Sequence, residues 1–398
     1  MEAAAPITPD SVFRLGSLTK QLTAATVLKL IEDGRISLDD PVSRFFPDYP
    51  QPGGSATVRQ LLNHTSGIVS YTDVPGWMVE ANTNRAYTTD QMVALFRDLP
   101  SRTPPGQAWA YNNSGYVLLA AIVERVTGQR WHQVVEERVT RPLGLNTIGY
   151  GADHEASPAM VRGYTVTDGA VRASRPTHRS VPHAAGGLVG SVGDFARWTD
   201  ALHHGRVVSP ALYAEMIAPT SLPDGRAQPY GFGLATGEMR GRRVIRHDGR
   251  IAGFSTEGLY LPDQDVFVAV FANSDRPATQ PGLLARRLAA LAVGVPYRRF
   301  TQTAVDPAVV APLLGVYRVG SSGVSRRFFA RDGKLYAARA EGGPEREVLA
   351  AGGDEFFYPD SFTWFRIERR PDAEPVMHMH QDDSAAAELA VRVVEAPQ

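Results

Sequence analysis

The sequence predicts an α+β protein that carries a second, smaller all-β domain at its carboxyl end. Apolar residues first recur at helical spacing, and the pattern then changes to short apolar runs over 243–247, 254–261 and 265–272. Helices followed by consecutive strands are typical of the α+β class. A stretch rich in Pro, Thr and Arg at 298–312 indicates a linker between domains over 1–297 and 313–398.

The helices are expected mainly in the first half of the chain. The first should cover 17–34, because Ser17 suits the N-cap, Leu22 and Val27 belong to an apolar stripe, and Gly34 ends the pattern. Further helices are expected over 57–62, 89–98, 114–127, 131–140, 193–204, 209–217 and 279–293. The stretch 150–185, rich in Gly, Pro and His, is expected to be irregular.

The strands are expected in two groups. The three apolar runs should form consecutive antiparallel strands, since the turn Pro262-Asp263-Gln264-Asp265 joins the last two. The run 265–272 is apolar on both faces, as in a strand from the interior of a sheet. Over 313–398, short strands and frequent turns predict a small barrel.

Composition excludes several classes of function. The 398 residues carry a net charge of -1, so nucleic acid is not an expected partner. The absence of cysteine excludes disulfides, thiolate zinc sites and cysteine nucleophiles. No apolar run reaches the roughly 18 residues of a membrane span, and residues 1–15 lack the pattern of a signal peptide.

Lysine is scarce in this protein, which makes each lysine a candidate base. Only three of the 41 Lys and Arg residues are lysines, namely Lys20, Lys29 and Lys334. Arginine keeps its proton in proteins, whereas lysine loses it when the surroundings depress its pKa. Lys29 lies inside a helical pattern and Lys334 in a turn, where a solvated charge is the expected role.

Lys20 differs because Ser17 stands three residues before it at the start of a predicted helix. Side chains at this spacing share a helix face about 5 to 6 Å apart. A neutral lysine amine can take the serine proton and activate the hydroxyl as a nucleophile. An N-cap serine beside a solvated lysine is the alternative interpretation of this pair.

Two further groups of residues could complete such a site. Tyr111 and Asn113, two apart on a loop, could relay a proton and hold a lysine or a carbonyl, although a polar turn is the alternative. His247, Asp248 and Gly249 end a predicted strand, and a backbone N–H there could face that of Ser17 as an oxyanion hole. Taken alone, His247 is also consistent with an ordinary polar residue at a strand end.

The three groups together resemble the motifs of the penicillin-recognising serine enzymes. That superfamily includes β-lactamases of the AmpC type, D,D-carboxypeptidases, D-aminopeptidases and β-lactamase-like esterases. Its motifs, Ser-x-x-Lys, Tyr-x-Asn and Lys-Thr-Gly or His-x-Gly, correspond to Ser17–Lys20, Tyr111–Asn113 and His247–Gly249. Flanking phrases extend the resemblance over about 6–295; they begin at Phe13, Leu61, Pro142, Ala185 and Tyr230.

The resemblance implies a β-lactamase/transpeptidase-like fold and an acyl-enzyme mechanism without a metal or other cofactor. Ser17 would be acylated, Lys20 and Tyr111 would move protons, and Asn113 would position Lys20 and the substrate. His247 would tune Tyr111 or bind a substrate carboxylate. Gly249 would allow the substrate to approach, and backbone N–H groups of Ser17 and Arg250 would hold the oxyanion. The domain over 313–398 resembles the lipocalin-like appendage of some D-aminopeptidase-like relatives.

One departure from the family concerns the start of the chain. Relatives carry several tens of residues before the nucleophile, including two strands of the sheet, whereas Ser17 stands near the first residue here. Without those strands the run 265–272 becomes an exposed apolar edge. We therefore expect that the natural chain is longer or that another segment covers this edge.

The expected function is a serine hydrolase that cleaves a small ester or a D-amino-acid amide or peptide. A β-lactamase, a D,D-carboxypeptidase or an acyl transferase would use the same site, and a non-catalytic module with a penicillin-binding-protein fold is the alternative of another class. An α/β-hydrolase is set aside because no Gly-x-Ser-x-Gly occurs. Arg250 and His247 favour an anionic substrate group and, for His247, pH sensitivity near neutrality. Localisation and oligomeric state stay open, although relatives are often exported.

Overall fold

The computed structural model describes residues 6–320, 323–382, 384 and 386–393, so the chain ends at 1–5 and 394–398 lie outside it. Contacts group these residues into two compact units. The first contains Met1–Gly237 and Arg243–Ala289, and the second contains Glu238–Arg242 and Ala290–Gln398. The domain limits expected from composition, 1–297 and 313–398 with a linker over 298–312, stay predictions.

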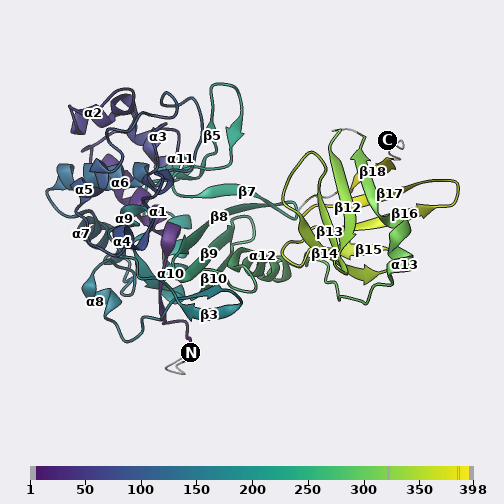
Figure 1. Ribbon diagram of the computed structural model, residues 1–398. Helices are drawn as coiled ribbons and strands as arrows, with labels where there is room; N and C mark the ends of the chain where they lie inside the picture. Colours follow the sequence, from purple (N-terminus) through teal and green to yellow (C-terminus); the bar gives the residue numbers. More distant parts are fainter. Residues whose placement is uncertain (1–5, 321–322, 383, 385, 394–398) are drawn as a thin grey trace. The chain divides into compact units, whose positions relative to one another are not determined.

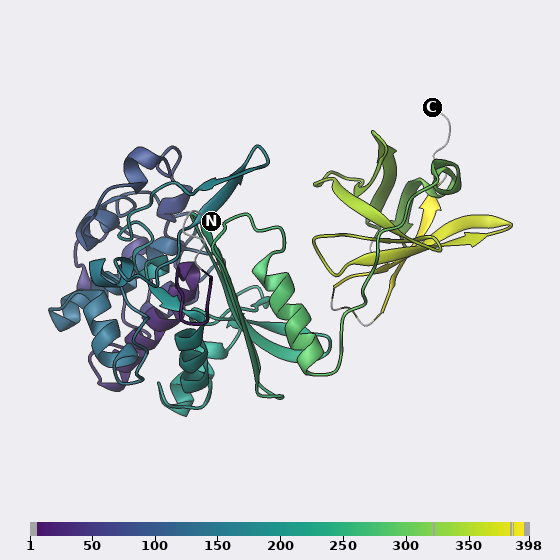
Figure 2. The same ribbon diagram turned by 90° about the horizontal axis from the view of Figure 1, so that it is seen from below.

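A four-stranded antiparallel sheet supports the first unit (Figure 1). Its order is β10-β9-β8-β7, and its strands are β7 (Ala235–Met239), β8 (Arg242–Ile251), β9 (Phe254–Leu261) and β10 (Val266–Ala272). All eight residues of β9 are buried, since helices lie against both faces. On one face Phe195 of α10 (Val192–His203) packs on Phe267 and Phe271. On the other, α12 (Pro281–Ala292) lies beside the sheet in both views (Figures 1 and 2).

The helices of the first unit confirm most of the sequence expectations. The central pair is α1 (Thr19–Glu32) and α6 (Asn113–Thr127), whose apolar faces supply much of the core. Around them lie α2 (Val42–Phe45), α3 (Val58–Leu62), α4 (Glu80–Thr83), α5 (Thr89–Ala94), α7 (Trp131–Val135), α8 (Ala152–Glu155), α9 (His183–Gly186) and α11 (Pro210–Ile217). The helix expected over 131–140 continues from α7 as one π turn, Glu136–Thr140.

The start of α1 differs from the expectation in one respect. Ser17 lies in a 3₁₀ turn, Gly16–Leu18, and Leu18 occupies the N-cap without a capping side chain. The Ser17 hydroxyl instead lies beside the Lys20 amine. The expectation of an N-cap serine was therefore wrong, because the hydroxyl contacts another side chain in place of the helix backbone.

The stretch expected to be irregular, 150–185, contains short regular pieces besides loops. A hairpin forms from β2 (Tyr164–Thr167) and β3 (Ala170–Ala173), and α9 follows at its end. Nearby, β1 (Val12–Arg14) pairs with β4 (Val189–Ser191), which brings the residues before Ser17 next to those after α9. A last short ladder joins β5 (Thr220–Ser221) to β6 (Ala227–Gln228).

Strand β10 lies at an edge of the sheet, as its position after β9 requires. Each of its seven residues is partly exposed, although the sequence Val-Phe-Val-Ala-Val-Phe-Ala is apolar on both faces. Within the described residues no ladder forms along its outer edge. An additional segment over this edge therefore stays a prediction.

The second unit is built on a closed eight-stranded barrel, which confirms the barrel expected from the sequence. Its strands are β11 (Gly315–Val319), β12 (Ser325–Arg331), β13 (Lys334–Arg339), β14 (Arg346–Gly352), β15 (Glu355–Phe357), β16 (Trp364–Arg370), β17 (Ala373–His380) and β18 (Glu388–Val393). Alternate side chains fill the interior, among them Tyr317, Phe328 and Phe365. The short helices α13 (Pro307–Val310) and Ala311–Leu313 precede it.

No helix in the described part of the chain is long and apolar enough to cross a membrane. The run Met377-His378-Met379-His380 lies in β17. His378 is 2.8 Å from a Glu368 carboxylate oxygen, and His380 stacks on Trp364.

Candidate active site

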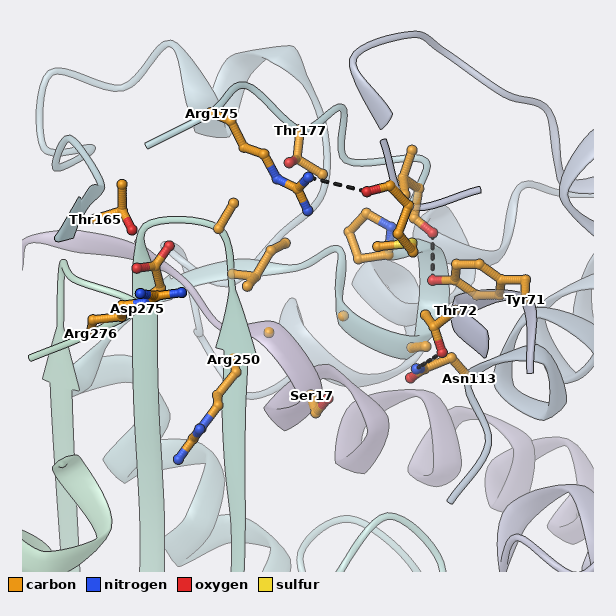
Figure 3. Close-up of a pocket in the computed structure, with 18 of the residues that line it drawn as sticks. Ser17, Tyr71, Thr72, Asn113, Thr165, Arg175, Thr177, Arg250, Asp275 and Arg276 are labelled. Atoms are coloured by element: carbon orange, nitrogen blue, oxygen red, sulfur yellow. Dashed lines mark hydrogen bonds between the residues drawn. The ribbon is translucent and has the colours of Figure 1, made fainter. Parts of the chain in front are cut away.

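A cavity of about 690 Å³ opens beside Ser17 in the first unit (Figure 3). Figure 3 shows Ser17 between Asn113 on one side and Arg250 on the other. Apolar side chains such as Val181 and Ile251 line part of the wall. Polar side chains line the rest; they are Tyr71, Thr72, Thr165, Thr167, Arg175, Thr177, Asp275 and Arg276. The cavity therefore places an apolar surface and several polar groups within reach of one hydroxyl.

The turn that carries Ser17 lies directly on strand β8. Gly16 has a φ of 56°, and a Cβ at this position would lie 2.9 Å from the backbone nitrogen of Arg250. Only glycine therefore fits, for its backbone angle and for its lack of a side chain. This contact holds the turn that carries Ser17 against the backbone of Arg250. The sequence assigned the backbone N–H groups of Ser17 and Arg250 to an oxyanion hole.

Gly249 also lies against the turn that carries Ser17, and it does not line the cavity. A Cβ there would lie 2.1 Å from the Leu15 carbonyl oxygen and 2.3 Å from the Thr256 hydroxyl. The Thr256 hydroxyl also donates to the Leu15 carbonyl at 2.9 Å. A close approach at Gly249 is thus made by the chain's own residues before Ser17. The approach of a substrate to this residue stays a prediction.

Lys20 lies at the base of the site and has no exposed surface. Its Nζ is 3.2 Å from Ser17 Oγ, 2.9 Å from Asn113 Oδ1 and 2.8 Å from the Ala185 carbonyl oxygen. Burial lowers the pKa of Lys20 well below its usual value, and nearby Asp248 only partly offsets this. A neutral amine has two N–H donors, which the Asn113 and Ala185 oxygens can accept. Its lone pair is then left for the Ser17 proton.

Asn113 is held in place from the start of α6. Asn112 caps this helix by accepting from the Gly115 N–H at 3.0 Å, which orients the next residue toward the site. The Asn113 amide nitrogen donates to the Thr72 hydroxyl at 3.3 Å, so its oxygen faces Lys20. Its backbone N–H donates to the Ser70 hydroxyl at 3.2 Å.

Tyr111 contacts both members of the Ser–Lys pair. Ser17 lies near enough to its hydroxyl to lower its pKa in part, and Lys20 Nζ lies 4.7 Å from the centre of its ring. Although the residue is 37% exposed, burial raises the pKa of Tyr111 above its usual value, more than Ser17 lowers it. The phenol is therefore protonated at neutral pH and can donate to a leaving group.

His247 lies behind Tyr111 and is only 5% exposed. Its Nδ1 is 2.6 Å from the Asp248 carbonyl oxygen and its Nε2 is 2.8 Å from the Tyr230 hydroxyl. Because a carbonyl only accepts, Nδ1 carries the hydrogen and Tyr230 donates to Nε2. Burial, reinforced by Lys20, lowers the pKa of His247 to about 4.

This geometry changes two expectations for His247. Both ring nitrogens are engaged, so no N–H of this residue is available to bind a substrate carboxylate. The ring is neutral from pH 5 to 8, so the expected pH sensitivity near neutrality does not come from its protonation. Its ring centre lies 6.2 Å from that of Tyr111, and it reaches the site through packing and through Tyr230.

Arg250 lines the cavity, but its guanidinium donates to the Gln280 side chain at 3.3 Å. Sequence reasoning assigned no role to Tyr230, Thr72, Arg175, Asp275 or Arg276, which the fold brings to the site or its wall. Only Tyr230 belonged to a phrase that the sequence singled out. The others come from loops without a local motif, so no pattern could identify them.

Several known proteins are similar to this chain in sequence and in fold. The family model described as Beta-lactamase matches residues 1–293. A D-aminopeptidase of Gluconobacter oxydans is 29% identical over 82% of this chain, and penicillin-binding protein 4* of Bacillus subtilis is 25% identical over 97%. A D-stereospecific amidohydrolase from a Streptomyces species is 31% identical over 67% of this chain, with a TM-score of 0.60.

The matches cover different shares of those proteins: 60% of the D-aminopeptidase, 89% of the penicillin-binding protein and 83% of the amidohydrolase. The chain thus spans less than two thirds of the D-aminopeptidase it matches. The matched family region contains the whole Ser17 site, from the nucleophile turn to β8. This protein belongs to the beta-lactamase family.

Proposed function

We propose that this protein hydrolyses the amide bond of a small D-amino-acid amide or short peptide through an acyl-enzyme on Ser17. The observation that carries the proposal is the position of Lys20 Nζ, buried and 3.2 Å from Ser17 Oγ. A lysine held this way is a base and cannot serve as a surface charge. The roles assigned below to Lys20, Tyr111, Asn113, His247 and Arg250 belong to the same proposal.

The acylation step uses the groups around Ser17. Ser17 Oγ bonds to the substrate carbonyl carbon while its proton passes to the Lys20 amine. The carbonyl oxygen becomes an oxyanion, which the backbone N–H groups of Ser17 and Arg250 stabilise by hydrogen bonds. The carbon–nitrogen bond then breaks, and Tyr111 transfers a proton to the leaving amine while Lys20 returns one to Tyr111. A water molecule then attacks the carbonyl carbon of the acyl-enzyme in place of Ser17. The same residues take up its proton and return one to Ser17 Oγ, and the acid is released.

Asn113 and His247 support these steps without exchanging protons. The Asn113 oxygen fixes one N–H of Lys20, so that the lone pair points toward Ser17. The Asn113 side-chain N–H lies at the cavity and is suited to a substrate carbonyl. His247 holds Tyr230, which packs against Tyr111 with ring centres 6.3 Å apart.

The choice of substrate rests on two supports. The matched D-aminopeptidase and D-stereospecific amidohydrolase carry names that describe cleavage of D-configured amides. Tyr111 provides a protonated phenol beside Ser17, and an amide needs a proton on its leaving nitrogen more than an ester does. A β-lactamase or D,D-carboxypeptidase activity is the second candidate, which the resemblance to penicillin-binding protein 4* favours.

The proposal is tested first by chemical labelling. A fluorophosphonate probe should add once to the protein, as seen in its intact mass, and not to Ser17→Ala; Ser37→Ala, at an exposed position, is the matched control. Turnover is then compared for D- and L-phenylalanine amide, p-nitrophenyl acetate and nitrocefin. Faster cleavage of the D-amide than of the L-amide supports the proposal.

Other outcomes identify the alternatives. Rapid nitrocefin turnover without amide hydrolysis would assign the protein to the β-lactamases. Labelling with ester turnover alone would indicate an esterase. Absence of any adduct on a folded protein would favour the non-catalytic module with the same fold.

A further inference from the structure

We infer that His64 is a positioning residue for Tyr111, and that the proton relay depends on it. The inference rests on the acyl-enzyme function proposed above, because it assigns His64 to one step of that reaction. His64 follows α3 in the chain, far from Tyr111 in sequence, and does not line the cavity. His64 belongs to the phrase that begins at Leu61, but the sequence assigned no role to its side chain.

Two hydrogen bonds tie His64 to the backbone on either side of Tyr111. The Ala110 N–H donates to the His64 carbonyl oxygen at 3.0 Å. The Asn112 N–H donates to His64 Nδ1 at 3.2 Å. Tyr111 is therefore bracketed by two bonds to one residue, one to its backbone and one to its ring. Asn113, by contrast, is anchored separately by the Ser70 hydroxyl.

The imidazole ring also packs on the phenols of the site. Its centre lies 4.5 Å from that of Tyr111 and 4.7 Å from that of Tyr230, the residue that donates to His247. His64 thus contacts Tyr111, the proposed proton donor, and Tyr230, which links Tyr111 to His247. Rotation of the Tyr111 ring would disturb this packing, so the ring of His64 limits where the Tyr111 hydroxyl can lie.

The state of the ring follows from its surroundings. His64 is 1% exposed, and burial, with Lys20 and His247 nearby, lowers its pKa well below the usual value. The neutral ring accepts at Nδ1, so the hydrogen resides on Nε2. Among the described residues, no group accepts a hydrogen bond from Nε2. The ring is therefore a fixed acceptor for Asn112 and takes no part in proton transfer.

Histidine is an unfavourable choice here for stability alone. His64 adopts a φ of 66°, a region that side-chain-bearing residues rarely occupy, and it buries an unpaired N–H. Strained and unpaired groups of this kind concentrate at functional sites, where the surrounding structure maintains them. The ring at this position combines an acceptor for Asn112 with a flat surface for Tyr111, and no apolar residue offers both.

The test compares two substitutions that separate these properties. His64→Asn keeps an acceptor near the Nδ1 position and suits the positive φ, whereas His64→Phe keeps the flat ring and removes the acceptor. The rate of fluorophosphonate labelling reports whether Ser17 and Lys20 remain assembled, and kcat and KM are measured on the substrate turned over fastest. We expect kcat for His64→Phe to fall by about 100-fold with KM little changed, since a shift of about 1 Å can cost this much. His64→Asn should recover about 10-fold of that loss.

A double-substitution cycle with Tyr111→Phe separates positioning from general damage. If His64 acts through Tyr111, His64→Phe should change kcat by less than 3-fold in the Tyr111→Phe background. If the effects of the two substitutions on kcat multiply in full, the inference is overturned. An unchanged kcat in a folded His64→Phe protein would overturn it as well. If that variant does not fold, the same cycle is run with His64→Asn.

Two further results keep the inference distinct from the proposed function. In histidine-selective ¹⁵N spectra, the ring signals that the wild type shows and His64→Asn lacks belong to His64. These signals should report an unprotonated Nδ1 from pH 5 to 8. A protonated Nδ1 would contradict the acceptor role whatever the activity. If the wild type forms no Ser17 adduct, the proposed function fails; if it forms one and the His64 variants keep full kcat, only the inference fails.

Discussion

Gly16 and Arg250 touch through their backbones, since a Cβ on Gly16 would lie 2.9 Å from the Arg250 nitrogen. The two residues are 234 positions apart along the chain, and this contact holds the turn that carries Ser17 against strand β8. A side chain on Gly16 would push the two apart, and the proposed oxyanion hole would open.

The first prediction follows from that contact. Gly16→Ala should lower kcat by about 100-fold or more, the loss typical when one oxyanion donor is removed. The matched control is Gly34→Ala, because Gly34 has a φ of 68° but no atom within 4 Å of its would-be Cβ. Both variants should lose about 1 to 2 kcal/mol of stability from the positive φ, measured by denaturant unfolding, but only Gly16→Ala should lose kcat. Equal kcat in the two variants would contradict the role of the contact.

The second prediction concerns Lys20, the proposed base. Lys20→Arg keeps a cation but cannot release its proton, so kcat should fall by about 10² to 10⁴-fold. Lys29→Arg, in the same helix and partly exposed, should keep wild-type kcat. The two variants are compared by labelling rate and by turnover. Wild-type labelling of Lys20→Arg would show that another group activates Ser17.

The third prediction uses the lowered pKa of Lys20 to forecast stability against pH. The unfolded chain binds this proton up to about pH 10.5, whereas burial makes the folded chain release it at lower pH. Since the unfolded state then holds more protons, stability should rise with pH between the lowered pKa and about 10.5. Lys20→Met lacks this proton, so its melting temperature should rise less over that window. Parallel curves of melting temperature against pH for the two proteins would mean that the pKa of Lys20 is not lowered in the folded state.

The fourth prediction concerns Glu257, a carboxylate of β9 that is 2% exposed. Burial raises its pKa to about 7, although Arg246, 3.1 Å away, lowers it in part. A raised carboxylate pKa favours the protonated folded state, so stability should be full near pH 4.5 and decline as pH rises through 7. Glu257→Gln should remove this decline and gain about 1 to 3 kcal/mol above pH 7. Urea unfolding at pH 5 and pH 8 measures the stability of both proteins. A larger loss of stability in Glu257→Gln than in the wild type at pH 8 would refute the prediction.

The fifth prediction concerns His247 and Tyr230. With a pKa of about 4, His247 should not contribute an inflection to kcat/KM between pH 5 and 8. Tyr230→Phe leaves its Nε2 without a donor, which should cost about 1 to 3 kcal/mol of stability and reduce kcat. The pH profiles of the wild type and His247→Gln are compared. An inflection near neutrality that disappears in His247→Gln would restore the pH-sensitive role.

Much of the fold was predictable because its patterns are local. Helical spacing located α1 and α6 within a residue or two, and apolar runs located β9 and β10. Strand β8 extends to Ile251, beyond the end expected at 247, so His247 and Gly249 lie inside the strand. The barrel was predictable from strand length and turns, since a small all-β domain has few other ways to pair its edges. The capping of α1 was mispredicted, because the sequence does not show that the Ser17 hydroxyl contacts Lys20 and Tyr111 in place of the helix backbone.

The sequence by itself identified the principal residues of the candidate site. Ser17 and Lys20 are three apart on one helix, and Tyr111 and Asn113 flank the cap of another, so their spacing is set by local geometry. Only the tertiary structure decided what surrounds them. The pKa of Lys20, the acceptors for His247 and the bracket that His64 places around Tyr111 depend on burial and on contacts between distant segments. Those contacts arise from packing, and packing leaves no periodic trace in a single sequence.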